Sequence, residues 1–144
     1  MIRKILEEEE HHFDNDPVRP HIPAFFRVTE PNETYIFNFD YNGGVDAVIC
    51  VAYLNGIPIN EQELHLNCCT TNADIAVFYT VWSYTKGAGT EIIFAVKEHI
   101  EKTKPHVKRF VTLSPCTEMA TRFHLKNGAI LLNKYEEFQN FEYK

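Results

Sequence analysis

The sequence lacks the features that mark secreted, membrane-spanning or nucleic-acid-binding proteins. Its four cysteines, which include the adjacent pair Cys68 and Cys69, show no disulfide-framework spacing, so reduced thiols in a cytoplasm are expected. No apolar stretch follows the acidic run 7–10, so no signal peptide is predicted, and no apolar run is long enough to span a bilayer. Lysine and arginine total 14 against 20 aspartates and glutamates and form no dense cluster, which argues against nucleic acid as a partner.

The histidines and cysteines also lack the spacing of a metal site. His11 and His12 are neighbours in sequence and cannot share one face of a helix. Together with Cys68 and Cys69 they form no zinc-binding spacing, so no metal is expected.

What is present is the composition of an ordinary globular chain. The 144 residues are 44% hydrophobic and 24% charged, which predicts one domain over 1–144 with its own core. No internal repeat or low-complexity tract occurs. Residues 1–13 are expected to form an acidic helix, and 14–23, which contain three prolines, a packed connector.

The first half of the chain predicts antiparallel strands. Apolar and alternating runs favour strands at 24–28, 33–40 and 45–54. The sequence Tyr41-Asn42-Gly43-Gly44 is a strong turn signal between the last two, which gives a hairpin. Residues 60–66 are either a short helix or a loop, and 68–74 a polar loop.

The second half predicts a parallel pair followed by a helix and a hairpin. Residues 75–83 are apolar on both faces, as in a central strand. An amphipathic helix at 90–102 crosses to a strand at 107–113, which makes the two strands parallel. A helix at 117–127 with Thr117 as N-cap and Gly128 after its end, and a hairpin of 129–134 and 138–143, complete the chain.

The expected fold class is therefore α/β, a mixed and mostly antiparallel sheet with a central parallel pair, flanked by helices. The strand pairing changes from antiparallel to parallel in the middle of the sheet. The two parallel strands are expected to separate, or splay, after Ser83. Ligands favour such breaks in open sheets.

The turn between the central strand and its helix is the first candidate site. Gly87 and Gly89 let a backbone approach a diphosphate, and free N–H groups at a helix start attract anions. Lys86 would add positive charge. The alternative is a tight turn without a ligand, because the segment matches neither a Walker loop nor a dinucleotide fingerprint.

Two further segments are candidates for chemistry. Thr112 and Ser114 follow a central strand, where open α/β sheets bind ligands, although such hydroxyls also form caps and turns. His124 lies mid-helix between Phe123 and Leu125. It is either a general acid near neutral pH or a packed core histidine.

These segments resemble the GNAT superfamily of CoA-dependent acyltransferases. Its pyrophosphate loop, Q/R-x-x-G-x-G/A, matches Tyr84-Thr85-Lys86-Gly87-Ala88-Gly89, with Tyr84 in place of Gln or Arg. Its helix pattern A-x-x-F-Y-x-K-x-G-F matches 120–129, with His124 in place of Tyr. The segments A-V-F-Y-T-V, F-V-T-L-S-P and F-H-L-K-N-G-A are similar, over 25–132, to the catalytic domain of the malonyl-CoA decarboxylase family. Small proteins of marine phages are also similar.

The resemblance implies a GNAT-like fold and an enzyme acting on a CoA thioester, either malonyl-CoA or acetyl-CoA. The N–H groups of 86–90 would hold the pyrophosphate, and the strand edge 80–83 would pair with the pantetheine arm. His124 would donate a proton, and Ser114 or Thr112 would hold the thioester oxygen or the malonyl carboxylate. The CoA-binding residues implied are Val81, Trp82, Ser83, Tyr84, Thr85, Lys86, Gly87, Ala88, Gly89 and Thr90.

Two other functions stay open. One is N-acetyl transfer to a small amine, and the other is a domain that binds CoA or a partner protein without chemistry. Two departures from the family support the domain without chemistry. Tyr84 stands where the family has Gln or Arg, and Pro115-Cys116-Thr117-Glu118-Met119 stands where the family has P-I-P-G-F. The family's helical N-terminal domain is not found in the sequence. Monomer and oligomer both stay open.

Overall fold

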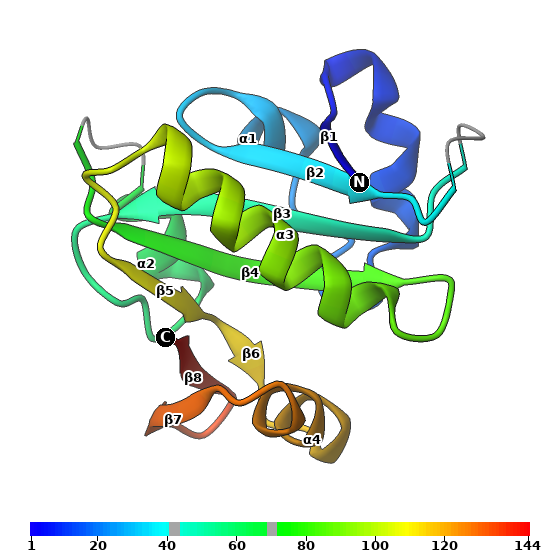
Figure 1. Cartoon of the computed structure of the whole chain (residues 1–144). Coiled ribbons are helices and arrows are strands. Elements are labelled where there is room, and N and C mark those ends of the chain that lie inside the picture. Colours follow the sequence, from blue (N-terminus) through cyan, green and yellow to red (C-terminus); the bar gives the residue numbers. More distant parts are fainter. Residues whose placement is uncertain (41–43, 69–71) are drawn as a thin grey trace.

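The computed structural model describes residues 1–40, 44–68 and 72–144 (Figure 1), and in them eight strands form one sheet. The order is β1-β2-β3-β4-β5-β8-β6, with β7 paired to β8. Among the described strands, β4 and β5 form the parallel pair and all other pairings are antiparallel. The strands are β1 (Ile2–Lys4), β2 (Glu33–Phe37), β3 (Ala47–Leu54), β4 (Ile75–Ser83), β5 (Arg109–Thr112), β6 (Ser114–Pro115), β7 (Ile130–Lys134) and β8 (Phe138–Tyr143).

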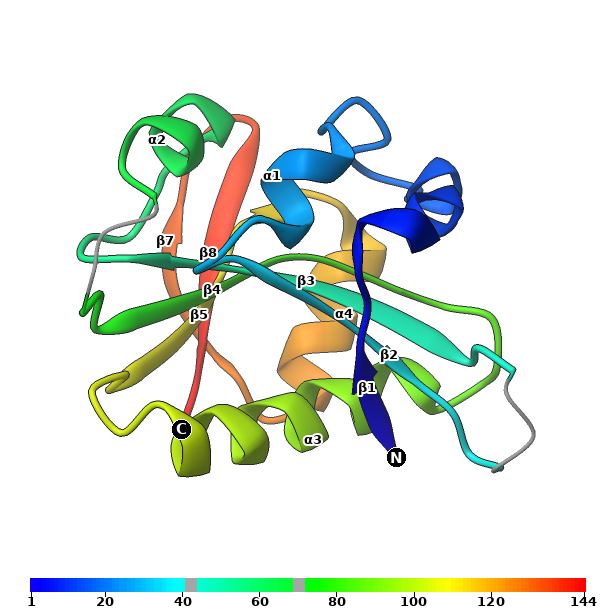
Figure 2. The ribbon, with the colours of Figure 1, turned by 90° about the horizontal axis from the view of Figure 1, so that it is seen from above.

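Helices cover both faces of this sheet (Figure 2). The long helix α3 lies on one face, while η1, α1 and α2 lie on the other, and α4 packs beside the C-terminal hairpin. The described helices are η1 (Glu7–Asn15, a 3₁₀ helix), α1 (Ala24–Val28), α2 (Glu61–Leu66), α3 (Ala88–Thr103) and α4 (Glu118–Lys126).

The two covered faces explain why the central strands read as continuous apolar runs. Every residue of β3 is buried. Ile49 and Val51 pack on the α3 side, and Val48 and Cys50 pack on the opposite side. Strands buried on both faces lose the alternation of apolar and polar residues. The central position predicted for β4 is confirmed, and β3 lies beside it.

A β-bulge in β4 sets where the sheet opens. Across the β3–β4 pair Cys50 faces Thr80 but Val51 faces Phe78, so Tyr79 is an extra residue in β4. A bulge bends its strand and increases the local twist. The parallel pairing ends at Phe78 and Thr112, and Ser114 pairs with β8 instead. The predicted splay therefore exists, but it begins after Phe78 and not after Ser83.

Two predictions about the N-terminal third are wrong, one in part and one in full. The expected helix over 1–13 is present only from Glu7, as the 3₁₀ helix η1, whereas Ile2–Lys4 form the strand β1, which pairs with β2. The apolar spacing of Ile2, Ile5 and Leu6 fits either structure, and pairing with the free edge of β2 decided it. The expected strand at 24–28 is the helix α1, which buries Phe26 and Arg27. A five-residue apolar run does not distinguish a strand from a helix.

The C-terminal predictions are confirmed. The Thr117 side chain accepts a hydrogen bond from Ala120 N at the start of α4, and Gly128 beyond its end has φ 90°. β7 and β8 form the expected hairpin. The predicted turn at 41–44 lies almost wholly outside the described residues.

The cysteines do not all have the predicted state. Cys50 and Cys116 carry free thiols. Cys68 takes part in a disulfide, so the expectation of reduced thiols throughout is wrong at that position. A disulfide framework is recognised from the spacing of cysteines along the sequence, and Cys68 has no such spacing to Cys50 or Cys116.

Candidate functional site

A cavity of about 510 Å³ lies where β4 separates from β5 and β6. Its walls come from the segment 17–19, β4, residues 113–115, the first turn of α3 and α4. The structure thus brings together segments that are far apart in sequence. Six of the predicted site residues line the cavity: Val81, Trp82, Ser83, Gly89, Ser114 and His124.

The edge of β4 beyond Phe78 is available on the cavity side. Residues 80–83 pair with β3 on one side, and no described strand pairs with them on the other. The carbonyl of Tyr79, at the start of this edge, accepts a hydrogen bond from Arg19 Nη1. An extended ligand that carries amide groups can pair with such a free edge.

The start of α3 has the geometry of an anion site. Gly87 adopts φ 86° at the N-cap, a left-handed conformation that favours glycine. Ala88 N donates to Thr85 O at 3.1 Å and Glu91 N donates to Gly87 O at 3.1 Å. The N–H groups of Gly89 and Thr90 donate to no backbone carbonyl of the preceding turn in the described part of the chain, so they are the donors left for an anion.

The loop before α3 is held by Asp46, the residue that precedes β3, and not by contacts with the cavity. Thr85 Oγ1 donates to Asp46 Oδ1 at 2.5 Å and Tyr84 N donates to Asp46 O at 2.8 Å. The hydrogen bond from Thr85 lowers the pKa of Asp46. Trp82 Nε1 donates to Tyr84 Oη at 2.9 Å. The cavity is not lined by the other predicted residues of this turn, which are Tyr84, Thr85, Lys86, Gly87, Ala88 and Thr90. Tyr84 and Thr85 therefore shape the loop, and Lys86 is exposed at its tip.

Of the two predicted hydroxyls, Ser114 alone lines the cavity. Its Oγ is 2.8 Å from Thr112 Oγ1, and Thr112 Oγ1 also accepts a hydrogen bond from Phe141 N at 3.0 Å. Both side chains are buried. Thr112 therefore orients Ser114 from behind, and since hydroxyl protons rotate, Ser114 can either accept from a ligand or donate to it.

His124 is 5% exposed and reaches the cavity from α4. Its Nδ1 is 2.7 Å from Tyr143 Oη, and its ring packs against Phe141 with centroids 5.1 Å apart. Burial lowers the pKa of His124 from 6.5 to about 4, because desolvation disfavours the charged imidazolium. The imidazole is thus neutral near pH 7, which restricts the predicted general-acid role to that of a neutral hydrogen-bond donor.

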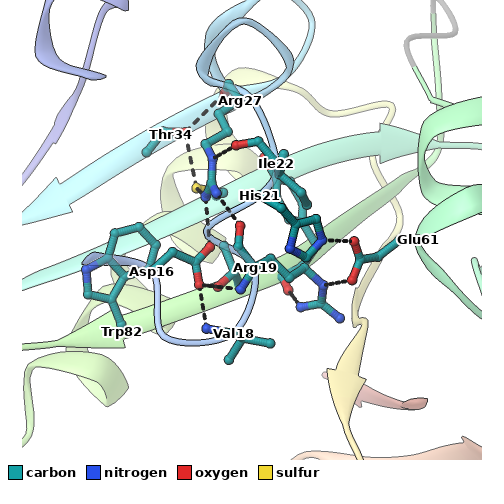
Figure 3. A network of polar contacts seen from close by, with 12 residues as sticks. Asp16, Val18, Arg19, His21, Ile22, Arg27, Thr34, Glu61 and Trp82 are labelled. Atoms are coloured by element: carbon teal, nitrogen blue, oxygen red, sulfur yellow. Dashed lines mark hydrogen bonds and ion pairs between the residues drawn. The ribbon is translucent and has the colours of Figure 1, made fainter. Parts of the chain in front are cut away.

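One wall of the cavity comes from a buried ion-pair cluster that sequence analysis missed (Figure 3). Arg27, fully buried, donates to Asp16 Oδ2 at 2.9 Å and to the Arg19 carbonyl at 2.6 Å. Asp16 Oδ1 accepts from Arg19 N at 2.9 Å and from Thr80 Oγ1 at 3.0 Å. Arg19 Nε is 3.2 Å from Glu61 Oε2. Because buried charges need partners, this cluster fixes the segment 16–19 against β4.

A weak signal for this cluster was present in the sequence. Asp16 precedes Pro17, and an aspartate before such a segment often bonds backbone N–H groups two or three residues on. Its side chain does so with Val18 N and Arg19 N, each at 2.9 Å. The pairing with Arg27 and Thr80 depends on the tertiary fold and has no local signal.

The described residues offer neither a metal-binding group nor a membrane-spanning helix. Residues 1–40, 44–68 and 72–144 contain no group of three or more His, Cys, Asp or Glu side chains arranged to hold a metal ion. Within the same ranges, none of the helices combines the length and apolar character that crossing a membrane requires.

No protein-family model matches the chain, and no curated protein sequence does. Solved structures do match. Malonyl-CoA decarboxylase from Agrobacterium vitis superimposes with a TM-score of 0.80 at 15% identity, over 100% of this chain and 60% of that one. This chain thus spans about three fifths of that decarboxylase.

Two shorter proteins match over nearly their whole length. GphF, a GNAT-like decarboxylase solved with isobutyryl-CoA, gives a TM-score of 0.79 at 12% identity, over 99% of this chain and 98% of that one. SpeG, a spermidine N-acetyltransferase from Vibrio cholerae, gives 0.65 at 9% identity, over 99% and 92%. At such identities the likeness establishes the fold, which is the GNAT-like fold predicted from the sequence. The similarity to phage proteins stays a prediction.

Proposed function

We propose that the protein binds an acyl-CoA and acts on its thioester as a GNAT-fold enzyme of the decarboxylase or acyltransferase type. The observation that carries the proposal is the cavity itself. It joins the start of α3 at Gly89, the free edge of β4, and the two polar groups Ser114 and His124. Each of these serves a different part of one ligand.

CoA binding is proposed from two of these features, the start of α3 and the free edge of β4. The N–H groups of Gly89 and Thr90, with the helix dipole of α3, would hold the pyrophosphate. The amides of the pantetheine arm would pair with β4 along 80–83, on the side that no described strand occupies. This path leads the thioester toward Ser114 and His124.

The chemistry favoured first is decarboxylation of malonyl-CoA. The bond between the carboxylate carbon and the α-carbon breaks, CO2 leaves, and the electron pair becomes an enolate of the thioester. A neutral His124 can donate a hydrogen bond to that enolate oxygen without losing its proton, and Ser114 can donate a second. The enolate then takes a proton from solvent water at its α-carbon, and acetyl-CoA is formed.

Acetyl transfer to a small amine is the second candidate, because SpeG has the same fold. In that reaction the amine attacks the carbonyl carbon, the C–S bond breaks, and the CoA thiolate needs a proton. The low pKa of His124 makes it a poor proton donor for this step near pH 7. A domain that binds CoA without chemistry is the third candidate.

The site of action also belongs to the proposal. Reactions of free acyl-CoA suit the cytoplasm, as do the free thiols of Cys50 and Cys116. Fractionation of the source cells would decide the point.

The test combines binding and turnover. We expect CoA and acetyl-CoA to raise the melting temperature, since a ligand at about 100 times its Kd adds roughly 2.7 kcal/mol to stability. Malonyl-CoA alone, followed by mass spectrometry, should yield acetyl-CoA in wild type and not in His124→Asn. The exposed His106→Asn serves as matched control. CoA release that requires added spermidine would support acetyl transfer instead. Binding of CoA without either reaction would support the non-catalytic domain. The absence of a melting shift at millimolar CoA would overturn the proposal.

A further inference from the structure

A chain of hydrogen bonds connects the start of α3 to His124. Thr90 Oγ1 donates to Asn127 Oδ1 at 2.8 Å, and Asn127 Nδ2 donates to Tyr143 Oη at 3.4 Å. Tyr143 Oη lies 2.7 Å from His124 Nδ1. The four side chains come from α3, from the end of α4, from β8 and from α4 again, so the chain exists only in the folded protein.

The direction of the chain follows from the kinds of atoms in it. Asn127 presents its amide oxygen to the Thr90 hydroxyl and its amide nitrogen to Tyr143. The amide nitrogen can only donate. Since Tyr143 Oη accepts that bond, its own proton is free to point at His124 Nδ1. A neutral imidazole that accepts at Nδ1 carries its proton on Nε2.

The Nε2 atom of His124 is the one that meets the contents of the cavity. It makes no hydrogen bond to the described residues and does not belong to the enclosed polar atoms without a partner. The ring is held edge and face by Phe123, Phe141 and Tyr143, so the imidazole cannot turn over without repacking these aromatic rings. A single nitrogen, with a single proton, thus faces the ligand.

We propose that Tyr143 and Asn127 are positioning residues that hold His124 as the Nε2–H tautomer, so that this N–H donates into the cavity. Neither residue lines the cavity, and both act through the histidine. The tautomer is a property of the folded protein alone, whereas its effect on turnover rests on the proposed function.

The decisive measurement is the tautomer of His124 in protein labelled with ¹⁵N on the histidine rings, without ligand, at pH 7. Two-bond ¹H–¹⁵N correlations distinguish Nε2–H from Nδ1–H. Wild type should show Nε2–H. Tyr143→Phe removes the donor to Nδ1 and should give a mixture of tautomers. Asn127→Asp offers Tyr143 a carboxylate, draws the phenol proton away from Nδ1, and should shift His124 toward Nδ1–H.

Matched controls are Tyr135→Phe and Asn133→Asp, at positions in or beside β7 that lie outside the cavity. Both should keep the wild-type tautomer. An Nδ1–H tautomer in wild type would overturn the proposal, as would an unchanged Nε2–H in folded Tyr143→Phe. The wild-type spectrum decides even where a variant does not fold.

Turnover separates this inference from the proposed function. If malonyl-CoA is converted, Tyr143→Phe should lower kcat on the order of 10–100-fold with little change in KM, as when outer-shell partners that orient a histidine are removed. If wild type converts no acyl-CoA, the proposed function fails while the tautomer result still stands. Equal kcat in wild type and in Tyr143→Phe, in the presence of turnover, would overturn the positioning role.

Discussion

The buried His124 predicts how the stability of this protein depends on pH. In the unfolded chain a histidine titrates near 6.5, and in the folded protein burial lowers the pKa of His124 to about 4. Between these values the unfolded chain binds a proton that the folded protein does not. Stability therefore falls as the pH decreases through this window, and the full contribution of the neutral histidine is present above pH 6.5.

The magnitude follows from the same two numbers. Each pKa unit of difference corresponds to about 1.4 kcal/mol, so lowering the pH from 7 to 4 should remove about 3 kcal/mol through His124. That is a large part of a typical total stability of about 5–15 kcal/mol. Carboxylates whose pKa is lowered by partners, such as Glu142 beside Arg109, add a further loss at the acid end of the range.

Urea unfolding at pH 7, 6, 5 and 4.5 would isolate the contribution of His124 to the pH dependence of stability. We expect the free energy of unfolding to decline with falling pH in wild type, and to decline less in His124→Asn, whose amide can still accept from Tyr143. The exposed His106→Asn should follow wild type. The difference between wild type and His124→Asn should change by about 2–3 kcal/mol across the series. Parallel curves for the two proteins would refute the burial argument.

Three further predictions concern other parts of the fold. Gly89→Ala places a Cβ 3.3 Å from Phe123 Cζ at the start of α3. Calorimetry should then show CoA binding on the order of tenfold more weakly, a loss of about 1.4 kcal/mol in binding free energy. An unchanged Kd for CoA would contradict the site. Asp16→Asn leaves the buried Arg27 without its carboxylate and should cost about 3–5 kcal/mol in urea unfolding, whereas a loss below about 1 kcal/mol would speak against the cluster. Asn60→Ala removes the N-cap bond to Glu63 N and should lower stability by about 1 kcal/mol without changing CoA affinity, as thermal unfolding and calorimetry would check.

The central and C-terminal elements were predictable because their signals are local. The apolar run of β4, the glycines before α3 and the helical spacing of Ile92, Ile93 and Val96 each fix one element. The Thr117 cap and Gly128 mark both ends of α4. Where an element's identity depends on which strand it meets, as for β1, the sequence allowed two structures and the prediction was wrong.

The candidate site was predictable in part, for the same reason. Gly89, Ser114 and His124 belong to short motifs and line the cavity as expected. Arg19 and Tyr143 reach the site through long-range contacts, Arg19 to the Tyr79 carbonyl and Tyr143 to His124. No spacing announces such contacts. The splay was placed five residues too late because the bulge at Tyr79 depends on the register with β3.

The charge distribution around the cavity bears on which reaction it supports. Among the described residues that line it, Arg19 carries the formal positive charge, and its guanidinium is already engaged by Glu61 and the Tyr79 carbonyl. Its remaining nitrogen, Nη2, has no hydrogen-bond partner among the described residues, but it is enclosed by protein. Under the proposed function, a malonyl carboxylate in the cavity would therefore meet no accessible cation among the described lining residues.

That environment favours loss of CO2 over retention of the acyl group. A carboxylate removed from water and left unpaired is raised in free energy, whereas the enolate that replaces it has its charge on an oxygen within reach of His124 and Ser114. The hydrogen bonds thus strengthen as the charge moves from the carboxylate to the thioester oxygen, which is the condition for catalysis by differential binding. An Arg or Lys introduced beside the acyl group, for example Val81→Lys, should then tighten malonyl-CoA binding and slow its decarboxylation. Faster turnover in that variant, measured as acetyl-CoA formed per enzyme, would show that the carboxylate needs a cation and that the argument from an uncharged cavity is wrong.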